Sequence, residues 1–126
     1  MPLLWEGNKM RYTGSIFKES KYHNKKCEYN GLKFDSIKER NYYIKLEYLQ
    51  RLGQIKELQR QVEFVLIETF KLEDKTYRKT KYIADFTYID QDGKYHVVDT
   101  KGFRTKEYQL KKKLMAWKYG IQIEEV

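Results

Sequence analysis

The pattern of apolar and polar positions becomes regular only from Lys26 onward. Residues 1–20 show no clear periodicity, and we expect an N-terminal arm there, ahead of a domain that spans residues 21–126. The segment KCEYNGLKF then places Asn30-Gly31 between two short alternating stretches. An Asn-Gly pair in that setting is the strongest short-range mark of a β-hairpin. The fold should therefore begin with a small hairpin.

A helix should follow this hairpin directly. Its apolar positions keep helical spacing at Ile37, Ile44, Tyr48, Leu49 and Leu52. Asp35 or Ser36 can cap the first turn, and Gly53 suits the left-handed position that follows the end of a helix. We predict a helix from about Ser36 to Leu52.

Three strands, a second helix and a closing strand complete the predicted order. These elements are strands over Gln61–Ile67, Lys81–Ile89 and Tyr95–Lys101, a helix between Thr105 and Gly120, and a strand over Ile121–Val126. The charged segment 72–80 is predicted as a turn region after the first strand. In the helix, Leu110, Leu114 and Trp117 share one face. The order α-β-β-β-α-β predicts a mixed α/β sheet.

The charge balance favours a polyanionic partner. The chain has 26 Lys and Arg against 18 Asp and Glu, a formal net charge of +8 and a pI near 9.4. Each phosphate that a basic side chain neutralises releases condensed counterions, so nucleic acid suits this balance. No apolar run approaches the ~18 residues of a membrane-spanning helix, and the first residues hold no apolar leader. We therefore expect no membrane partner and a cytoplasmic location.

The few cysteines and histidines exclude several kinds of site. Cys27 is the only cysteine, so neither an intrachain disulfide nor a cysteine-based zinc site is possible. His23 and His96 lie far apart in the sequence, and we interpret both as ordinary surface or strand residues. Nothing in the sequence indicates an organic cofactor.

The most informative segment is YIADFTYIDQDGKYHVVDTKG, which spans two predicted strands. Asp99 and Lys101 must project to one side of their strand, because side chains alternate with period two. A three-residue loop closed by Asp90 and Lys94 places Asp85 opposite Asp99 and leaves Gly93 in the left-handed position. A tight two-residue turn would shift the register by one and separate the two acids. We predict the longer loop.

Two carboxylates at close range repel each other unless a cation lies between them. Magnesium prefers oxygen ligands and lowers the pKa of bound water, while Lys101 could stabilise charge on a phosphate. The alternative is a cross-strand Asp–Lys salt bridge on a solvated sheet face, which is common on exposed strands.

The sequence resembles the PD-(D/E)XK nuclease superfamily over roughly residues 21–126. The matching motifs are FDSIKE at 34–39, YIADF at 82–86 and VDTKG at 98–102, in the superfamily's α-β-β-β-α-β order. Ala84 stands where the superfamily name has proline. The chain looks most like a small, phage-associated branch that resembles Holliday-junction resolvases. The resemblance implies a restriction-endonuclease-like core with a small N-terminal hairpin.

The resemblance also assigns roles to single residues. Asp85 and Asp99 would be the central acids, Glu39 the third acidic metal ligand and Lys101 the catalytic lysine. The Thr100 carbonyl is implied as a further metal ligand. Gln61 lies near the branch's Leu-Gln-Pro position, where the chain has Arg60-Gln61-Val62, and could have a positioning role.

Glu39 has an alternative role that the pattern leaves open. Ser36-x-x-Glu39 is a capping box, in which the Glu39 carboxylate would bind the backbone amide of Ser36. Both roles are compatible if the side chain caps the helix without metal and turns to the metal when one is bound.

Basic residues bracket the acidic motif and form the predicted DNA-binding set. These residues are Arg78, Lys79, Lys81, Arg104, Lys106, Lys111, Lys112 and Lys113. Tyr77, Tyr82 and Tyr108 could stack on bases. A solvated face for each lysine and partial core packing for each tyrosine are the alternatives.

These observations together predict a Mg²⁺-dependent DNA endonuclease, with Mn²⁺ as a second candidate metal. Branched or recombination intermediates are one candidate substrate class, and cutting two strands would require a homodimer. The location would be the host cytoplasm if a phage encodes the chain. The alternatives are a catalytically silent DNA-binding or accessory phage protein that retains the fold, and a basic scaffold for a protein partner.

Overall fold

The computed structural model describes residues 26–101 and 105–126. The chain divides into two compact units, Met1–Arg40 and Asn41–Val126. The predicted arm at residues 1–20 lies outside the described residues. None of the helices within the described ranges is long and apolar enough to cross a membrane.

The described part of the first unit contains the predicted hairpin. Strands β1 (Cys27–Tyr29) and β2 (Leu32–Phe34) pair antiparallel. Asn30 and Gly31 both adopt positive φ, at 51° and 80°, which is the conformation that a two-residue turn between twisted strands requires. The Asn-Gly prediction is confirmed.

Helix α2 (Ile37–Arg51) begins in the first unit and continues into the second. The Ser36 hydroxyl accepts a hydrogen bond from the Glu39 amide at 3.1 Å, so Ser36 is the N-cap. Gly53 has φ 78°, and its amide donates to the Gln50 carbonyl at 3.0 Å. The predicted start and end of the helix are therefore confirmed to within one residue.

The apolar face of α2 differs from the predicted one. Leu46 is the buried side chain, whereas Tyr48 and Leu52 are more than half exposed. The rings of Tyr42 and Tyr43 lie 6.0 and 5.9 Å from the ring of Phe86 in the sheet. Leu46, Tyr42 and Tyr43, none of which belongs to the predicted set, therefore contribute to the packing of this helix.

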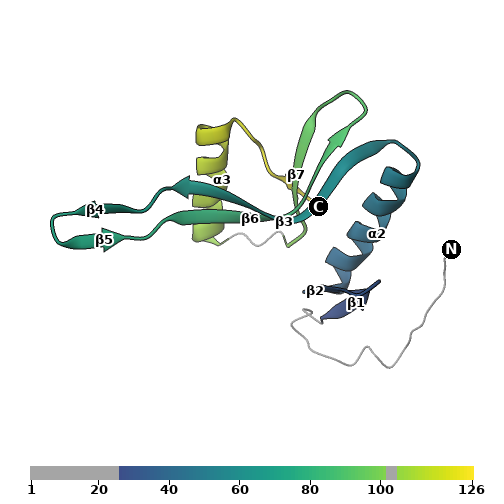
Figure 1. Ribbon diagram of the computed structural model, residues 1–126, viewed down its shortest axis with the longest axis horizontal. Coiled ribbons are helices and arrows are strands. Elements are labelled where there is room, and N and C mark those ends of the chain that lie inside the picture. The colour runs from purple at the N-terminus through teal and green to yellow at the C-terminus, as the bar shows by residue number, and fades with distance from the viewer. Residues whose placement is uncertain (1–25, 102–104) are drawn as a thin grey trace. The chain divides into compact units, whose positions relative to one another are not determined.

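The second unit is built on a four-stranded mixed sheet in the order β3-β6-β7-β8 (Figure 1). These strands are β3 (Ile55–Ile67), β6 (Thr80–Asp90), β7 (Tyr95–Asp99) and β8 (Glu124–Glu125). The first two pairings are antiparallel, and β7 pairs with β8 in parallel. Helix α3 (Lys106–Tyr119) connects β7 to β8. The predicted mixed α/β class is confirmed, and α2, β3, β6, β7, α3 and β8 follow one another in the predicted order.

The β6–β7 hairpin has the predicted register. Phe86 pairs with Val98, and the Asp90 amide donates to the Lys94 carbonyl at 2.9 Å. Gly93, inside this three-residue loop, has φ 84°. Continuing the register by one position places Asp85 opposite Asp99, as the longer loop requires.

Three sequence predictions about strand boundaries are wrong, and one of them concerns β8, which covers Glu124–Glu125 and not Ile121–Val126. Strand β3 begins at Ile55 rather than Gln61, and its register with β6 shifts between Lys56 and Gln59. Glu57 has φ 57° within this shift, so the bulge breaks the alternation by which a strand is recognised. Strand β7 ends at Asp99, two residues earlier than predicted.

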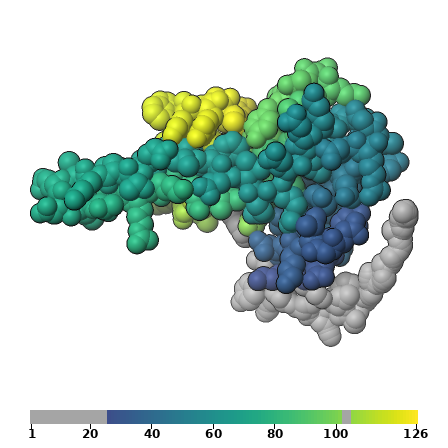
Figure 2. All heavy atoms as spheres, viewed as in Figure 1, coloured from purple at the N-terminus to yellow at the C-terminus, as the bar shows by residue number. Residues whose placement is uncertain are grey.

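The segment predicted as a charged turn contains a second hairpin. Strands β4 (Phe70–Leu72) and β5 (Lys75–Tyr77) pair antiparallel, and the rings of Phe70 and Tyr77 stack at 4.8 Å. Every residue of the two strands is exposed. This hairpin projects from the sheet as a narrow arm, drawn in teal (Figure 2).

Helix α3 buries a face that contains only one of the three residues predicted to share it, Leu114, which packs against the core cluster. Its buried residue is Met115, which packs in a core cluster with Leu66, Tyr82, Ala84, Val97 and Ile123. Leu110 and Trp117, predicted to face the core, are 56% and 78% exposed. The ends of the helix are as predicted: the Thr105 hydroxyl accepts from the Tyr108 amide at 3.0 Å, and Gly120 has φ 67°.

His96 connects three strands near the loop end of the β6–β7 hairpin. Its Nε2 lies 2.7 Å from Asp90 Oδ2, its Nδ1 contacts Glu124 Oε2, and the ring of Tyr88 stacks on it at 4.6 Å. Burial lowers the pKa of His96, but the hydrogen bonds to Asp90 and Glu124 outweigh burial and raise it above its ordinary value. The sequence interpretation of His96 as an ordinary strand residue missed this link.

Candidate active site

Asp85 and Asp99 form a pair of buried carboxylates where the β6–β7 ladder ends. Asp85 is 4% exposed and Asp99 is 7% exposed. Buried carboxylates are costly unless protein donors or a cation compensate them. The contacts of each acid therefore decide what the pair can do.

Thr100 supplies the donors to Asp85. Its backbone amide and its hydroxyl both donate to Asp85 Oδ2, each at 2.8 Å. Burial is the largest influence on the Asp85 pKa and raises it. The Thr100 hydrogen bonds and the Lys101 charge lower this pKa and the Asp99 charge raises it, with a net rise. Within the described part of the chain, no donor contacts Asp85 Oδ1, so this oxygen is available to a cation.

Asp99 is held from two directions. The Tyr82 hydroxyl donates to Asp99 Oδ2 at 2.8 Å, and the Lys101 amide donates to Oδ1 at 2.8 Å. Burial, followed by the charge of Asp99, raises the pKa of Tyr82, so its hydroxyl stays a proton donor. Each carboxylate oxygen has two lone pairs, so both can still ligate a cation.

The alternation of strand β6 breaks at Asp85. Ala84 packs in the core cluster with Met115 of α3, whereas Phe86, two residues later, packs on Tyr42 and Tyr43 of α2. Residues two apart normally share a face of a strand. Gln61 occupies the position of β3 between the partners of Ala84 and Phe86, opposite Asp85, and it has φ 52°. A positive φ is uncommon for a residue other than glycine.

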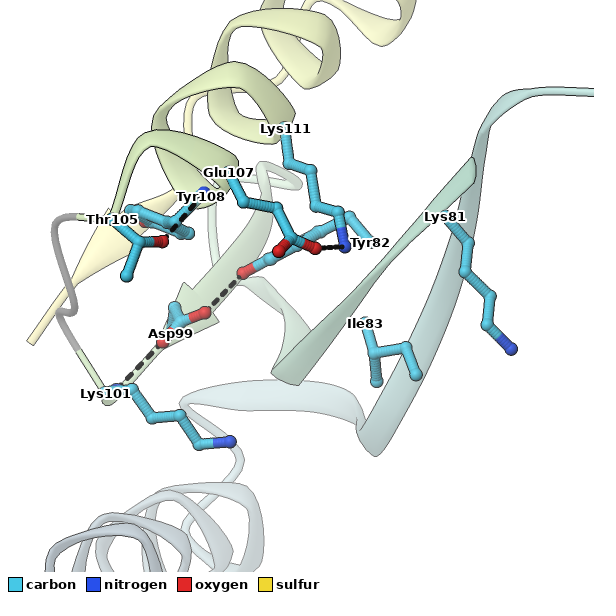
Figure 3. A pocket seen from close by; sticks show the side chains of 9 residues that line it. All are labelled: Lys81, Tyr82, Ile83, Asp99, Lys101, Thr105, Glu107, Tyr108 and Lys111. Atoms are coloured by element: carbon cyan, nitrogen blue, oxygen red, sulfur yellow. Dashed lines mark hydrogen bonds and ion pairs between the residues drawn. The ribbon is translucent and has the colours of Figure 1, made fainter. Parts of the chain in front are cut away.

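A cavity of about 350 Å³ opens beside Asp99 (Figure 3). Its lining consists of Lys81, Tyr82, Ile83, Asp99, Lys101, Thr105, Glu107, Tyr108 and Lys111. Strand β6 and the first two turns of α3 form its sides, and Asp99 lies between them with the Tyr82 hydroxyl (Figure 3). The cavity therefore gives the Asp99 carboxylate a concave, lysine-lined surrounding.

Of the basic residues predicted to bind DNA, the structure brings Lys81 and Lys111 to this cavity. Lys111 forms an ion pair with Glu107 at 3.0 Å, and Lys81 pairs with Glu63 at 3.3 Å. The remaining described members do not line the cavity: Arg78, Lys79, Lys106, Lys112 and Lys113. Arg104 lies outside the described residues.

Two of the tyrosines predicted to stack on bases have other roles. Tyr82 is 4% exposed and donates to Asp99. The Tyr108 hydroxyl donates to Glu125 Oε2 at 2.8 Å, the oxygen that Lys112 also contacts at 3.0 Å. The stacking prediction is therefore wrong for Tyr82. Its position could not be found from the sequence, because a regular strand would turn Tyr82 away from Asp85.

Glu39 and Thr100 are the other residues predicted to ligate the metal. Glu39 belongs to the first unit, in the first turn of α2, and is 1% exposed. Its amide binds the Ser36 hydroxyl, which is one of the two hydrogen bonds of the capping box. The metal-ligand role of Glu39 stays a prediction. The metal-ligand role of the Thr100 carbonyl also stays a prediction. The Thr100 amide and hydroxyl donate to Asp85.

The donor set of the second unit fits magnesium. Across residues 26–101 and 105–126, no group of three or more His, Cys, Asp or Glu is arranged to hold a metal ion. Asp85 and Asp99 provide two carboxylates, one with an oxygen that has no donor in the described chain. Magnesium is commonly bound by one or two carboxylates, with waters and substrate phosphates as the other ligands. The pair thus has the hard oxygen ligands of that ion.

Comparison with known proteins yields one family. A family model described as "Protein of unknown function (DUF1064)" matches residues 19–124, well over half of the chain. No curated protein and no solved structure gives a significant match.

Proposed function

We propose that this chain, which belongs to the DUF1064 family, is a metal-dependent endonuclease that hydrolyses DNA phosphodiester bonds. One observation carries the proposal: Asp85 and Asp99 are both buried, the β6–β7 register continued by one position places them opposite each other, and Asp99 lines a cavity to which three lysines contribute. A structural salt bridge on a solvated face, the alternative reading of the motif, would leave the two acids exposed.

The residues of the site have separate tasks in this proposal. Asp85, through Oδ1, and Asp99 would hold a magnesium or manganese ion. Such an ion, when bound, supplies a water of lowered pKa and neutralises charge on a phosphate. Thr100 and Tyr82 hold the two carboxylates in place through their hydrogen bonds. Lys101 follows Asp99 directly, and its charge lowers the Asp85 pKa, so it acts close to the pair and stabilises charge that develops on the phosphate.

The cavity supports a nucleic acid as substrate. Lys81 of β6, Lys101 after the end of β7 and Lys111 of α3 all line this cavity. Lysines placed in this way can follow a phosphate backbone, and the formal net charge of +8 adds long-range attraction. Ile83, which is 43% exposed, offers an apolar contact for a sugar or base beside them.

Three further features belong to the proposal, and the first of them comes from the resemblance. They are a branched or recombination intermediate as the substrate, a homodimer that cuts two strands, and action in the cytoplasm, which is the host's if a phage encodes the chain. A homodimer is favoured because one active site cuts one strand at a time.

A second candidate function is DNA binding without hydrolysis. It is favoured by the hydrogen bonds that both carboxylates already receive from Thr100, Tyr82 and Lys101. Such bonds could stabilise the pair as a structural element in an accessory protein that keeps the nuclease fold.

The deciding experiment incubates purified protein with labelled junction, duplex and single-stranded DNA, with Mg²⁺, Mn²⁺ or EDTA. The endonuclease proposal expects metal-dependent cleavage of at least one substrate and a loss of about 10²–10³-fold in rate for Lys101→Ala. DNA binding without cleavage of any substrate in either metal would support the accessory function instead. Cleavage that Lys101→Ala leaves unchanged would indicate a contaminating nuclease.

A further inference from the structure

We infer that Tyr82 is a positioning residue, whose hydroxyl fixes the orientation in which the Asp99 carboxylate meets a divalent cation. The inference deepens the proposed function and rests on it for the identity of the site. Nothing in the D…D-x-K motif or in its spacing assigns this tyrosine a role, because it stands three residues before Asp85.

The hydrogen bonds around Asp99 fix the plane of its carboxylate. The Tyr82 hydroxyl donates to Oδ2 at 2.8 Å, while the Lys101 amide donates to Oδ1 at 2.8 Å. The Lys101 bond spans two residues of the chain, so it follows from the local backbone. The Tyr82 bond crosses from β6 to β7 and constrains the side chain from outside its own strand. Removing it would leave the Lys101 bond as the one hydrogen bond to this carboxylate from the described residues.

The ring of Tyr82 is itself held in place. It is 4% exposed and packs in the core cluster with Leu66, Ala84 and Met115. Its backbone pairs with Phe64 of β3, and the Tyr108 ring lies 6.5 Å from its own. The ring is therefore fixed by core packing, and it holds the hydroxyl in position at the cavity.

A donor of this kind changes how a carboxylate binds a metal. The hydroxyl occupies one lone pair of Oδ2 and leaves the others for a cation. It holds the carboxylate in one rotamer, so less conformational freedom is lost when the ion binds. Partners that hydrogen-bond metal ligands typically contribute about 10–100-fold to metal affinity. Tyr82 should contribute in this range.

The test compares Tyr82→Phe with Tyr119→Phe in the full chain. Tyr119 is the matched control, because its hydroxyl also makes one short hydrogen bond, to the Val65 carbonyl at 2.6 Å, and it does not line the cavity. Mn²⁺ affinity is measured without DNA, by the electron paramagnetic resonance signal of the free ion. Asp99→Asn identifies the binding event that belongs to this site.

The expected result is a rise of about 10–100-fold in the Mn²⁺ dissociation constant of Tyr82→Phe, with Tyr119→Phe close to wild type. A purely structural role would lower the resistance to urea and leave the affinity of the folded fraction unchanged, so both quantities are measured on each variant. In a cleavage assay, Tyr82→Phe should require more Mg²⁺ for half-maximal rate and approach the wild-type rate at saturating Mg²⁺.

Unchanged Mn²⁺ affinity in folded Tyr82→Phe would overturn the inference, as would a wild-type affinity that Asp99→Asn does not reduce. The proposed function fails separately. If the wild type binds Mn²⁺ through Asp99 but cleaves no DNA, the endonuclease proposal is wrong, and the affinity of Tyr82→Phe still decides the role of Tyr82.

Discussion

Thr100 donates two hydrogen bonds to one oxygen of Asp85, from its amide and from its hydroxyl, both at 2.8 Å. Thr100 directly follows β7 and Asp85 lies in β6, and the two residues are 2% and 4% exposed. The arrangement stabilises one side of a buried carboxylate and leaves Asp85 Oδ1 without a donor in the described chain. The hydrogen bonds thus offset part of the cost of burying the Asp85 carboxylate, and Oδ1 can still bind a cation.

Replacing Thr100 with valine should destabilise the fold. The hydroxyl bond to a buried carboxylate is a hydrogen bond to a charged group, so its loss should lower the free energy of unfolding by about 1.5–3 kcal/mol. Urea unfolding in the absence of metal measures this decrease in the free energy of unfolding. Thr100→Ser keeps the hydroxyl and should lose less than half as much. A larger loss in Thr100→Ser than in Thr100→Val would show that the methyl group, which valine keeps and serine lacks, contributes more than the hydroxyl.

Asp85→Asn should lose activity without losing stability. The substitution removes a charge that burial and the neighbouring Asp99 disfavour, while the amide oxygen can still accept the Thr100 hydrogen bonds. We expect cleavage to fall by at least about 100-fold and the free energy of unfolding to stay within about 0.5 kcal/mol of wild type or to rise. A loss of stability larger than about 2 kcal/mol would mean that the acid is structural.

Lys111→Ala should weaken DNA binding by an electrostatic mechanism. Each phosphate contact contributes about 0.9 to the slope of log affinity against log salt, so the slope should fall by about one. Titrations of fluorescent DNA in EDTA at several salt concentrations measure this slope. Lys94→Ala is the control, because Lys94 is exposed at the loop end of the β6–β7 hairpin, away from the cavity. A similar drop in both variants would mean that net charge alone drives binding.

The link between His96, Asp90 and Glu124 should make stability depend on pH. The folded pKa of His96 is raised, so its contribution is fully present below the ordinary value of 6.5 and is lost as pH rises through the folded value. The folded pKa of Asp90 is lowered, chiefly by its hydrogen bond to His96. The contribution of Asp90 is therefore present above its ordinary value of 3.8 and is lost as pH falls through the folded value.

The measurement is the difference in free energy of unfolding between wild type and His96→Asn as a function of pH. Together the two groups predict the largest advantage of wild type in weakly acidic solution and a decline toward alkaline pH. The variant Lys94→Ala, in the same hairpin, should follow the wild-type curve. An advantage that grows between about pH 6 and pH 9 would contradict the raised pKa of His96.

The sequence predicted the position of the acidic pair because local rules determine it. Gly93 can adopt positive φ without strain, so the three-residue loop is available, and the loop alone sets which residue lies opposite Asp99. The same is true of Asn30-Gly31, Thr105 and Gly120, whose turn and cap geometry depends on the residue itself. Features of this kind need no knowledge of the rest of the fold.

Tertiary contacts determine what the sequence could not predict. Met115 rather than Leu110 or Trp117 faces the core, because the sheet and not the apolarity of the helix selects the buried face. The bulge at Glu57 hid the first half of β3. Tyr82 lies near Asp99 because the alternation of side chains between the two faces of β6 is interrupted at Asp85, opposite Gln61 with its positive φ. No periodicity rule anticipates such a break.

The central claim is that Asp85 and Asp99 together ligate a divalent cation. Crystals grown with Mn²⁺ and measured at the manganese absorption edge test it directly. The account predicts an anomalous peak within about 2.0–2.4 Å of Asp85 Oδ1 and of an Asp99 oxygen, and its absence from crystals of Asp85→Asn. Well-ordered carboxylates at saturating Mn²⁺ with no peak between them would contradict it.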